Sequence, residues 1–385
     1  MIEDGEGTPS GIDIEALGKD LDALATSLRG EVGEDDRQHL FKMVRWSRGC
    51  FWLGYMTCSL FPNPLSAFLM STGNFSRWAM LSHHILHRGY DHIPHLPPRY
   101  TSRVYAKGWR RYVDWFDWML PEAWRHEHNI LHHYKLGEIH DPDQPEYNLE
   151  ALRQSSLPLF LRYLWVLVMA MLWKPFYYAP NTHLELYRAR QKKKKKPQEE
   201  ATLHARSVWL PWYKPGMYLW CYSWLPYFFR TFIVLPFPFL VLGRTYYIYA
   251  LCNIVLAELL TNLHSFLMIV PNHAGHDVYR FNQPTKDRYG FYLRQIIGSV
   301  NYRCGGHLND FMHGWLNYQI EHHLWPDMTM LQYQKAQSKV KAICLKHNVP
   351  YIQESVYKRL IKLLNVMVGK DSMPIWQDDI AVKSK

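Results

Sequence analysis

Two long apolar stretches, at residues 217–242 and 246–270, constrain the fold of this 385-residue chain more than any other feature. Each is long enough to cross the hydrocarbon core of a bilayer as a helix. A segment inside the bilayer must satisfy its own backbone hydrogen bonds, which a helix does without a partner. The sequence therefore predicts an all-α integral membrane protein.

Three shorter apolar stretches complete the predicted topology. Residues 44–61 and 65–81 are joined by the sequence PNP, which favours a turn, and are predicted to form the first pair of spans. A further stretch, 157–173, precedes the lysine run 192–196, and positively charged loops stay on the cytoplasmic side. Because the histidine clusters described below must meet on that side, 157–173 is expected to lie in the interface or to enter the membrane and return. We therefore predict about four transmembrane helices, one interfacial helix and both termini in the cytoplasm.

The sequence outside these stretches suggests polar ends and a helical cap. Residues 1–43 are polar, lack the apolar core of a signal peptide, and are expected to form a mobile tail. Residues 44–368 are expected to form one membrane domain. Its part after about residue 330 shows the apolar periodicity of amphipathic helices and is predicted to be a cytoplasmic cap. Residues 369–385 are expected to form a C-terminal tail.

Composition narrows the possible partners. Aromatic residues make up 15% of the chain, with 16 Trp and 26 Tyr, and these rings favour the membrane–water interface. The net charge of +10 suits loops that face an anionic leaflet. The basic residues are dispersed and accompany no recognition motif, so nucleic-acid binding is not expected. The six cysteines form no C-x-x-C pair, which argues against a thiolate metal site.

Histidines are concentrated in a few short patches. Of the 21 histidines, 17 lie within 83–95, 126–140, 264–276 and 307–323. Burying many imidazoles without partners would be costly in lost hydrogen bonds, so the clustering requires a partner.

Spacing identifies that partner as a metal. The sequences HHILH (83–87) and HNILHH (128–133) each carry histidines four residues apart, which share one helix face, and QIEHH (319–323) ends in a histidine pair. Clustered neutral imidazoles suit Fe, Zn, Cu or Ni. Eight or more histidines exceed the ligand set of a single zinc ion, and the chain has no HExxH motif. We interpret the pattern as a cap that holds a histidine-rich dimetal site, with a pair of irons that activates dioxygen.

The three clusters, in this order around paired apolar stretches, resemble the histidine boxes of the membrane fatty acid desaturase and hydroxylase superfamily. The sequence LNYQIEHHLWPDM (316–328) is similar to the third box of front-end acyl desaturases. The segments NHAGHD (272–277) and CLKHNVPY (344–351) also resemble that group. The resemblance covers about residues 45–355.

The resemblance implies a dioxygen-dependent, non-haem diiron desaturase that acts on a long acyl chain of an acyl lipid or acyl-CoA. It implies an external electron donor of the cytochrome b5 or ferredoxin type, and a location in the endoplasmic reticulum of a eukaryote or the inner membrane of a bacterium. The metal ligands implied by the matching positions are His83, His87, His128, His132, His133, His273, His276, His322, His323 and Gln319. Of the pair in 272–277, His273 is favoured over His276. His84 is either a further ligand or a neighbour of one.

Departures from the front-end pattern leave two other functions open. The second box has three spacers, as in hydroxylases and ketolases of the superfamily, so a hydroxylase or ketolase of a fatty acid, sphingolipid, alkane or carotenoid is an alternative. A membrane protein that only binds or carries metal is another. The sequence contains no His-Pro-Gly-Gly signature of a fused cytochrome b5, hence the external donor.

Two further groups of residues are candidates for supporting roles. Ligating imidazoles need an acceptor on their second nitrogen. Candidate acceptors are Asp91, Glu127, Asp141, Asp310 and Glu321. Candidate lining residues of an acyl tunnel are Trp220, Trp224, Phe228, Phe266 and Trp315.

Overall fold

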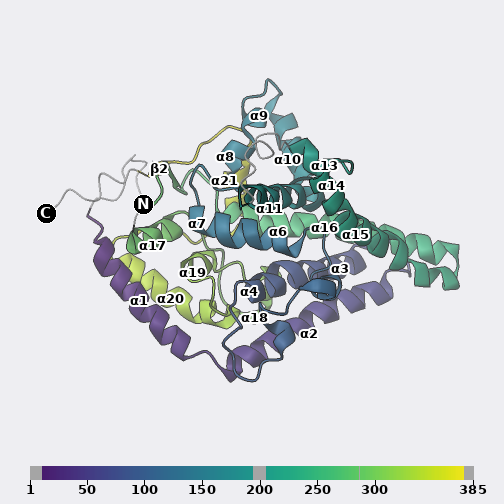
Figure 1. Ribbon diagram of the computed structural model, residues 1–385, viewed down its shortest axis with the longest axis horizontal. Helices are drawn as coiled ribbons and strands as arrows, with labels where there is room; N and C mark the ends of the chain where they lie inside the picture. Colours follow the sequence, from purple (N-terminus) through teal and green to yellow (C-terminus); the bar gives the residue numbers. More distant parts are fainter. Residues whose placement is uncertain (1–10, 194–204, 286, 377–385) are drawn as a thin grey trace.

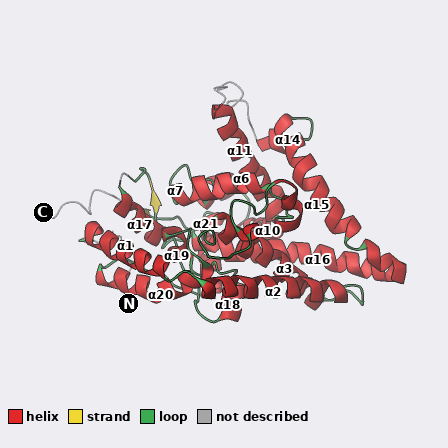
Figure 2. Cartoon of the chain, turned by 60° about the horizontal axis from the view of Figure 1, so that its bottom comes forward, coloured by secondary structure: helices red, strands yellow, loops and turns green. Residues whose placement is uncertain are grey.

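The computed structural model describes residues 11–193, 205–285 and 287–376, and it is helical through most of this length (Figures 1 and 2). Within the described chain the only sheet pairs β1 (Arg280–Phe281) in parallel with β2 (Ile375–Trp376). The predicted all-α class is confirmed.

The helices alternate between long regular segments and short turns, where η marks a π-helical or 3₁₀ segment. The first part contains α1 (Ile14–Gly30), α2 (Glu34–Thr57), α3 (Pro64–Phe75), η1 (Ser76–Ser82), α4 (His83–Leu86), η2 (Pro98–Tyr100), η3 (Gly108–Arg110), α5 (Arg111–Asp114), α6 (Pro121–His126), η4 (Glu127–His132) and α7 (His133–Lys135). The middle contains α8 (Pro145–Asn148), α9 (Glu150–Arg153), α10 (Leu159–Met171), η5 (Lys174–Tyr178), α11 (Ala179–Lys193), α13 (Ala205–Trp209), α14 (Lys214–Leu219), η6 (Trp220–Trp224), α15 (Leu225–Phe229), η7 (Arg230–Val234), η8 (Phe237–Leu242) and α16 (Arg244–Ile269). The last part contains η9 (Val270–Asn272), α17 (Arg288–Ile297), α18 (His307–Met312), α19 (Gln319–Leu324), α20 (Met330–Lys346) and α21 (Val356–Met367).

The first pair of predicted spans folds into a helical hairpin, α2 followed by α3. Gly54 and Gly73 each face the backbone of the opposite helix, where an added Cβ would come within 3 Å of main-chain atoms. These two glycines therefore let the helices approach closely. The turn is fixed by Asn253 of α16, whose amide nitrogen lies 2.7 Å from the carbonyl oxygen of Cys58. The hairpin is thus tied to the last long apolar helix.

Two helical segments, Ser207–Leu242 and Arg244–Asn272, are long and apolar enough to cross a membrane, in agreement with the two longest apolar stretches. A third candidate is the pair Leu159–Met171 and Lys174–Lys193, which meets the same criterion only when joined across an 85° bend. The hairpin does not qualify: α2 carries seven Asp, Glu, Lys or Arg residues among its 24, and α3 has only 12 residues. The described chain therefore offers two or three spanning helices, and four crossings stay a proposal.

The N-terminal segment corrects the expectation of a mobile tail over 1–43. α1 packs along α20 and α17 (Figure 1), and its residues Leu17, Leu21 and Leu28 are fully buried. These leucines recur at helical spacing within polar sequence, so they form one apolar stripe that the cap covers. The first ten residues lie outside the described chain. The segment from Ile14 onward is part of the folded molecule.

The C-terminal part forms the predicted cap helices, α20 and α21. The expected tail, 369–385, is described only as far as Trp376, and this portion is packed. Met373 is buried and β2 pairs with β1. The remainder of that expected tail lies outside the described residues.

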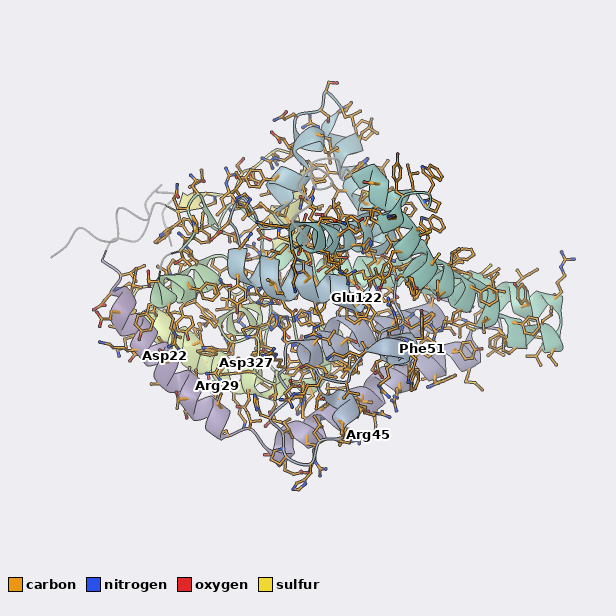
Figure 3. All side chains as sticks on the ribbon, in the orientation of Figure 1. Asp22, Arg29, Arg45, Phe51, Glu122 and Asp327 are labelled. Carbon is orange, nitrogen blue, oxygen red and sulfur yellow. The ribbon has the colours of Figure 1, made fainter. Side chains whose placement is uncertain are left out.

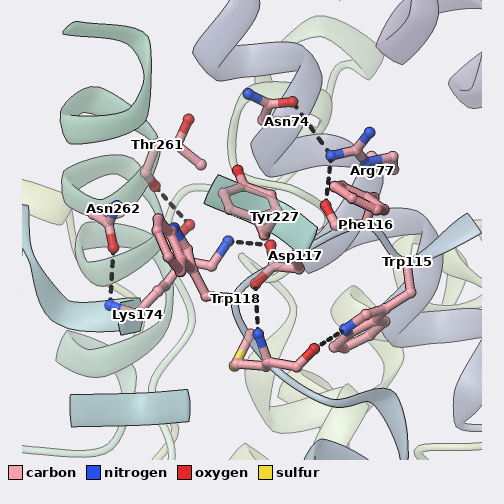
Figure 4. Close-up of polar contacts among 12 residues, drawn as sticks. Asn74, Arg77, Trp115, Phe116, Asp117, Trp118, Lys174, Tyr227, Thr261 and Asn262 are labelled. Atoms are coloured by element: carbon pink, nitrogen blue, oxygen red, sulfur yellow. Dashed lines mark hydrogen bonds and ion pairs between the residues drawn. The ribbon is translucent and has the colours of Figure 1, made fainter. Parts of the chain in front are cut away.

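A buried polar network joins the long helix α16 to the loop before α6 (Figure 4). Lys174 and Asp117 form an ion pair with side chains only 1% and 5% exposed. Next to it, Glu258 of α16 accepts hydrogen bonds from the indole nitrogen of Trp118 at 2.6 Å and the hydroxyl of Tyr227 at 2.8 Å. Charged groups at such depth are retained only with partners, and here they fix the loop against the apolar helices.

Candidate metal centre

The second histidine cluster lies on a π-helical turn, η4, and not on a regular α-helix. In a π-helix, hydrogen bonds join residues five apart, so residues at that separation share a face. His128 and His133 accordingly converge, with 3.2 Å between their Nε2 atoms. His132 also remains close to His128, because candidate ligand atoms of His128, His132 and Asp143 lie within 4.8 Å of one another. His132 in addition takes part in a neighbouring group of imidazoles.

The first group of imidazoles draws on all three clusters. The ligating nitrogens of its five members lie within 4.8 Å of one another, and every member is buried. The Nε2 atoms of His83 and His322 are 2.9 Å apart. Two nitrogens bound to one metal at about 2.1 Å would be separated by about 3 Å, as these are. The members are His83, His87, His128, His133 and His322.

A second group lies against the first. It consists of His132, His273 and His323, again with ligating nitrogens within 4.8 Å of one another. The rings of His133 and His323 are stacked with centroids 4.3 Å apart, which brings the two groups into contact. The Nε2 of Gln319 lies 2.8 Å from the Nε2 of His273, so the glutamine faces this second group.

Two histidines near these groups take no part in them. His276 is 53% exposed in its side chain, and its Nδ1 lies 3.8 Å from the Asp371 carboxylate. We therefore remove His276 from the candidate ligands and retain His273. The Nδ1 of His84 is 2.7 Å from the carbonyl oxygen of Met80 and the residue belongs to neither group, which makes it a neighbour of the ligands.

The outer nitrogens of several box histidines have acceptors. The Nδ1 of His132 lies 3.0 Å from an Asp141 oxygen, and the Nδ1 of His323 lies 2.9 Å from Oε1 of Gln295. The Nδ1 of His322 lies 3.2 Å from the hydroxyl of Tyr333, which donates its own proton to a carbonyl oxygen. Donation from Nδ1 leaves Nε2 unprotonated and directed inward, the form that binds metal.

Sequence reasoning identified only one of these acceptors. Asp141 was expected, whereas Gln295 and Tyr333 come from α17 and α20 and carry no local signal. Three other expected acids bind elsewhere in the described chain: Asp91 accepts from Ser102, Asp310 from Tyr318 and Glu321 from Tyr351. Glu127 lies 3.5 Å from the hydroxyl of Tyr178.

The electrostatics favour neutral imidazoles in the first group. Burial lowers the pKa of each of its members, and also that of His273 and His323. His132 differs: burial alone would lower its pKa, but the carboxylates of Asp141 and Asp143 together outweigh burial and the pKa is raised. Burial also raises the pKa of Asp143, which lies in the same region, to about 6.

The residues present fit a bound metal pair. The Nε2 atoms of His87 and His323 and the Oε1 of Gln319 are buried and have no hydrogen-bond partner among the described residues. Leaving such atoms unpaired is costly, and bound cations would satisfy them. Neutral, inward-facing imidazoles are the ligand type that iron and neighbouring transition metals accept.

An apolar cavity of about 150 Å³ adjoins both groups. Its walls come mainly from α10, α16 and the segment 143–149 around α8, with Met367 of α21. They include Leu149, Trp165, Met169, Trp173, Phe266 and Ile269, while His83, His128, His132, His273 and Gln319 line its metal side. Of the five tunnel residues expected from the sequence, only Phe266 lines this cavity. The others were wrong because α15 leads away from α19, which carries the third cluster (Figure 1), and because Trp315 is buried in the core.

Comparison with known proteins agrees with this geometry. A model of the family described as fatty acid desaturase matches residues 59–355. The NADPH-dependent stearoyl-CoA 9-desaturase of Mycobacterium tuberculosis is 22% identical over 352 residues, covering 88% of this chain and 75% of the relative. A Delta(8)-fatty-acid desaturase of Euglena gracilis is 32% identical over 111 residues, which cover 29% of this chain and 26% of the relative. The putative fatty acid desaturase 2-like protein FADS2B of Homo sapiens is 27% identical over 198 residues, covering 47% of this chain and 38% of the relative. Since the family model spans most of the chain and the histidine clusters converge, this protein belongs to the fatty acid desaturase family.

Proposed function

We propose that this desaturase introduces a double bond into a long acyl chain in a dioxygen-dependent reaction at a non-haem diiron centre. The observation that carries the proposal is the convergence of two buried imidazole groups beside an apolar cavity. The name of the mycobacterial relative supports an acyl-CoA substrate, and an acyl lipid stays open.

The proposed ligands fall into two sets, one for each iron. His83, His87, His128, His133 and His322 would hold one iron, and His132, His273 and His323 the other, with Gln319 beside the second. Two bound irons would supply the one-electron redox chemistry with dioxygen that attack on an unactivated methylene requires. Burial favours the neutral form of all of these imidazoles except His132, and hydrogen bonds to Asp141, Gln295 and Tyr333 orient His132, His323 and His322.

The cavity would position the substrate. Its apolar walls exclude water from the acyl chain, and the histidines at its metal side place one stretch of methylenes next to the centre. The balanced reaction removes two hydrogen atoms from adjacent carbons. Together with two electrons and two protons supplied from outside, it reduces one dioxygen molecule to two water molecules.

Hydroxylation on the same centre is the second candidate, favoured by the three-residue spacer of the second box. The two reactions diverge after the first hydrogen is removed. Desaturation requires a second C–H bond held close to the oxidant, whereas hydroxylation does not.

The test is expression in a host with simple lipids, followed by mass-spectrometric location of new double bonds or hydroxyl groups. We expect new unsaturation that the His322→Ala variant does not produce, although this variant still reaches the membrane. Added oxygen in place of unsaturation would favour hydroxylation. A purified, active sample with no iron would contradict the proposed centre.

A further inference from the structure

His273 reaches the second imidazole group from a segment without regular structure. It follows the short turn η9 at the end of α16, and residues 273–279 form neither helix nor strand. The other members of the two groups lie within or directly after helical turns, and each of those segments supplies at least two of them. The segment of His273 supplies only this one. Its position therefore depends on contacts with other parts of the molecule.

One side chain of the cap, Arg359 of α21, binds this segment at three places. Its Nε donates to the carbonyl oxygen of Pro271 at 3.2 Å, and its Nη2 to that of Ala274 at 2.7 Å. Its Nη1 donates to both carboxylate oxygens of Asp277, at 2.7 and 2.8 Å. The rigid, planar guanidinium thus holds the backbone on both sides of His273.

These contacts are buried, unlike the ion pairs at the surface of the cap. Arg29 and Asp327, which lie side by side between α1 and α20 (Figure 3), have side chains that are 49% and 46% exposed, and such pairs add little stability. The side chain of Arg359 has no exposed surface. Gly275 leaves room for it, because an added Cβ would lie 2.6 Å from Nη2. A charge at this depth is retained only with partners, and the segment of His273 supplies most of them.

The acids next to Arg359 have a second cation as partner. Lys362, one helical turn further along α21, places its Nζ 2.7 Å from an oxygen of Asp277 and 2.9 Å from both oxygens of Glu354. The Nη1 of Arg359 also lies 3.4 Å from Glu354. Two cations therefore face two carboxylates, and each carboxylate keeps a partner when one cation is removed. Of the two cations, only Arg359 bonds the backbone of 271–274 in the described chain.

The segment held by Arg359 places the ring of His273 against the second imidazole group. The ring centroid of His273 lies 5.0 Å from that of His132 and 4.6 Å from that of His323. A metal site accepts ligand distances only within about 0.2 Å of the preferred values. A small displacement of 271–274 would therefore remove His273 from this group, whereas the first group, which comes from other segments, would keep its geometry.

We propose that Arg359 is a positioning residue, which holds His273 in the second imidazole group by binding the backbone on both sides of it. The assignment rests on the proposed function, in which this group holds one of two irons. Arg359 does not line the apolar cavity and belongs to neither imidazole group, so it acts on the metal through His273. Its loss should affect the second iron and spare the first.

The test measures metal uptake, so that it does not depend on turnover. The full chain in nanodiscs is stripped of metal and titrated with ferrous iron under anaerobic conditions, and bound iron per chain is determined at each step. The native protein is expected to bind two ions. Arg359→Met should weaken the binding of one ion at least about tenfold and leave the other unchanged, because groups that orient metal ligands affect affinity by about 10- to 100-fold. Arg359→Lys keeps the charge without the planar fork and should give an intermediate loss.

Two further variants separate positioning from general damage to the fold. Lys362→Met is the matched control, because it removes one positive charge from the same two acids and leaves the bonds to Pro271 and Ala274 intact. It should bind both ions as the native protein does. In a His273→Ala background, adding Arg359→Met should weaken iron binding no further, because the residue through which the arginine acts is already absent.

Three outcomes would overturn the assignment. These are unchanged affinities of Arg359→Met for both ions, equal losses in Arg359→Met and Lys362→Met, and additive losses when Arg359→Met is combined with His273→Ala. If Arg359→Met does not reach the membrane, Arg359→Lys carries the same comparisons. The expected pattern of iron binding, in a native protein that forms no double bond, would instead contradict only the proposed function. A native protein that binds no iron would contradict the proposed centre and the role of Arg359 together.

Discussion

In several histidines of the three clusters, one ring nitrogen makes a hydrogen bond to the surrounding protein and the other points toward the neighbouring imidazoles. His132, His322 and His323 each direct Nδ1 to an acceptor from another part of the chain. That bond selects the tautomer and fixes the ring plane before any metal arrives. Because Asp141 is the one charged acceptor of the three, it has the strongest influence on its histidine.

We expect Asp141→Asn to weaken iron binding about 10- to 100-fold, because the amide loses the charge that supports His132. Iron content after dialysis against graded chelator concentrations measures this directly. Asp141→Glu should recover part of the affinity. Unchanged iron retention in Asp141→Asn would show that the carboxylate does not support the centre.

His273 and His276 provide a matched pair of variants at the same scale. His273→Ala removes one of three imidazoles from the second group and should lower the iron content and abolish most activity. His276→Ala alters a side chain that is 53% exposed and should leave both close to native. Iron per chain and product yield decide the comparison. The opposite ranking would restore His276 as the ligand.

At the scale of elements, the regular helices are predictable from sequence and the irregular ones are not. Leu17 and Leu21 in α1 recur at helical spacing, which is visible in the sequence, although the polar residues around them suggested a mobile tail. The π-helical turn at η4 has no such signal, and it brings the Nε2 of His133 to 3.2 Å from the Nε2 of His128. Gln295 and Tyr333 could not be assigned, because their proximity to histidines arises only when α17, α19 and α20 pack together.

The buried pair of Lys174 and Asp117 holds one such irregular element, η5, against the loop before α6. Lys174→Met should destabilise the protein by about 3–5 kcal/mol, because it leaves an unpaired buried carboxylate. The double variant Lys174→Met/Asp117→Leu should recover most of that loss, since no buried charge remains. Thermal unfolding in nanodiscs compares the three proteins. Equal melting temperatures of the single and double variants would show that the unpaired carboxylate is not the cause of the lost stability.

Over the whole molecule, the three boxes come from distant parts of the chain and meet between the apolar helices and the cap. Spacing and resemblance pointed to the histidines that converge in the two groups, with His276 as the exception, because the clusters are local in sequence. The walls of the apolar cavity were predicted poorly, since they depend on how α8, α10 and α16 are oriented. Of the expected wall residues only Phe266, at the end of α16, proved correct. Long-range packing thus determines the walls of the apolar cavity, whereas the histidines of each cluster are close together in the sequence itself.

This arrangement makes bound metal a cross-link within the fold. Each imidazole group joins η4 or α7 to α19, and His273 adds the segment after α16. Removing iron with a chelator should therefore lower the melting temperature and increase proteolysis between the boxes, because a ligand that binds only the folded state stabilises it. Readdition of ferrous iron under anaerobic conditions should restore the native melting temperature. His273→Ala should show a smaller chelator-induced shift than the native protein, since one of its two groups is already incomplete. A protein whose melting is the same with and without iron would show that the histidine groups are held by packing alone.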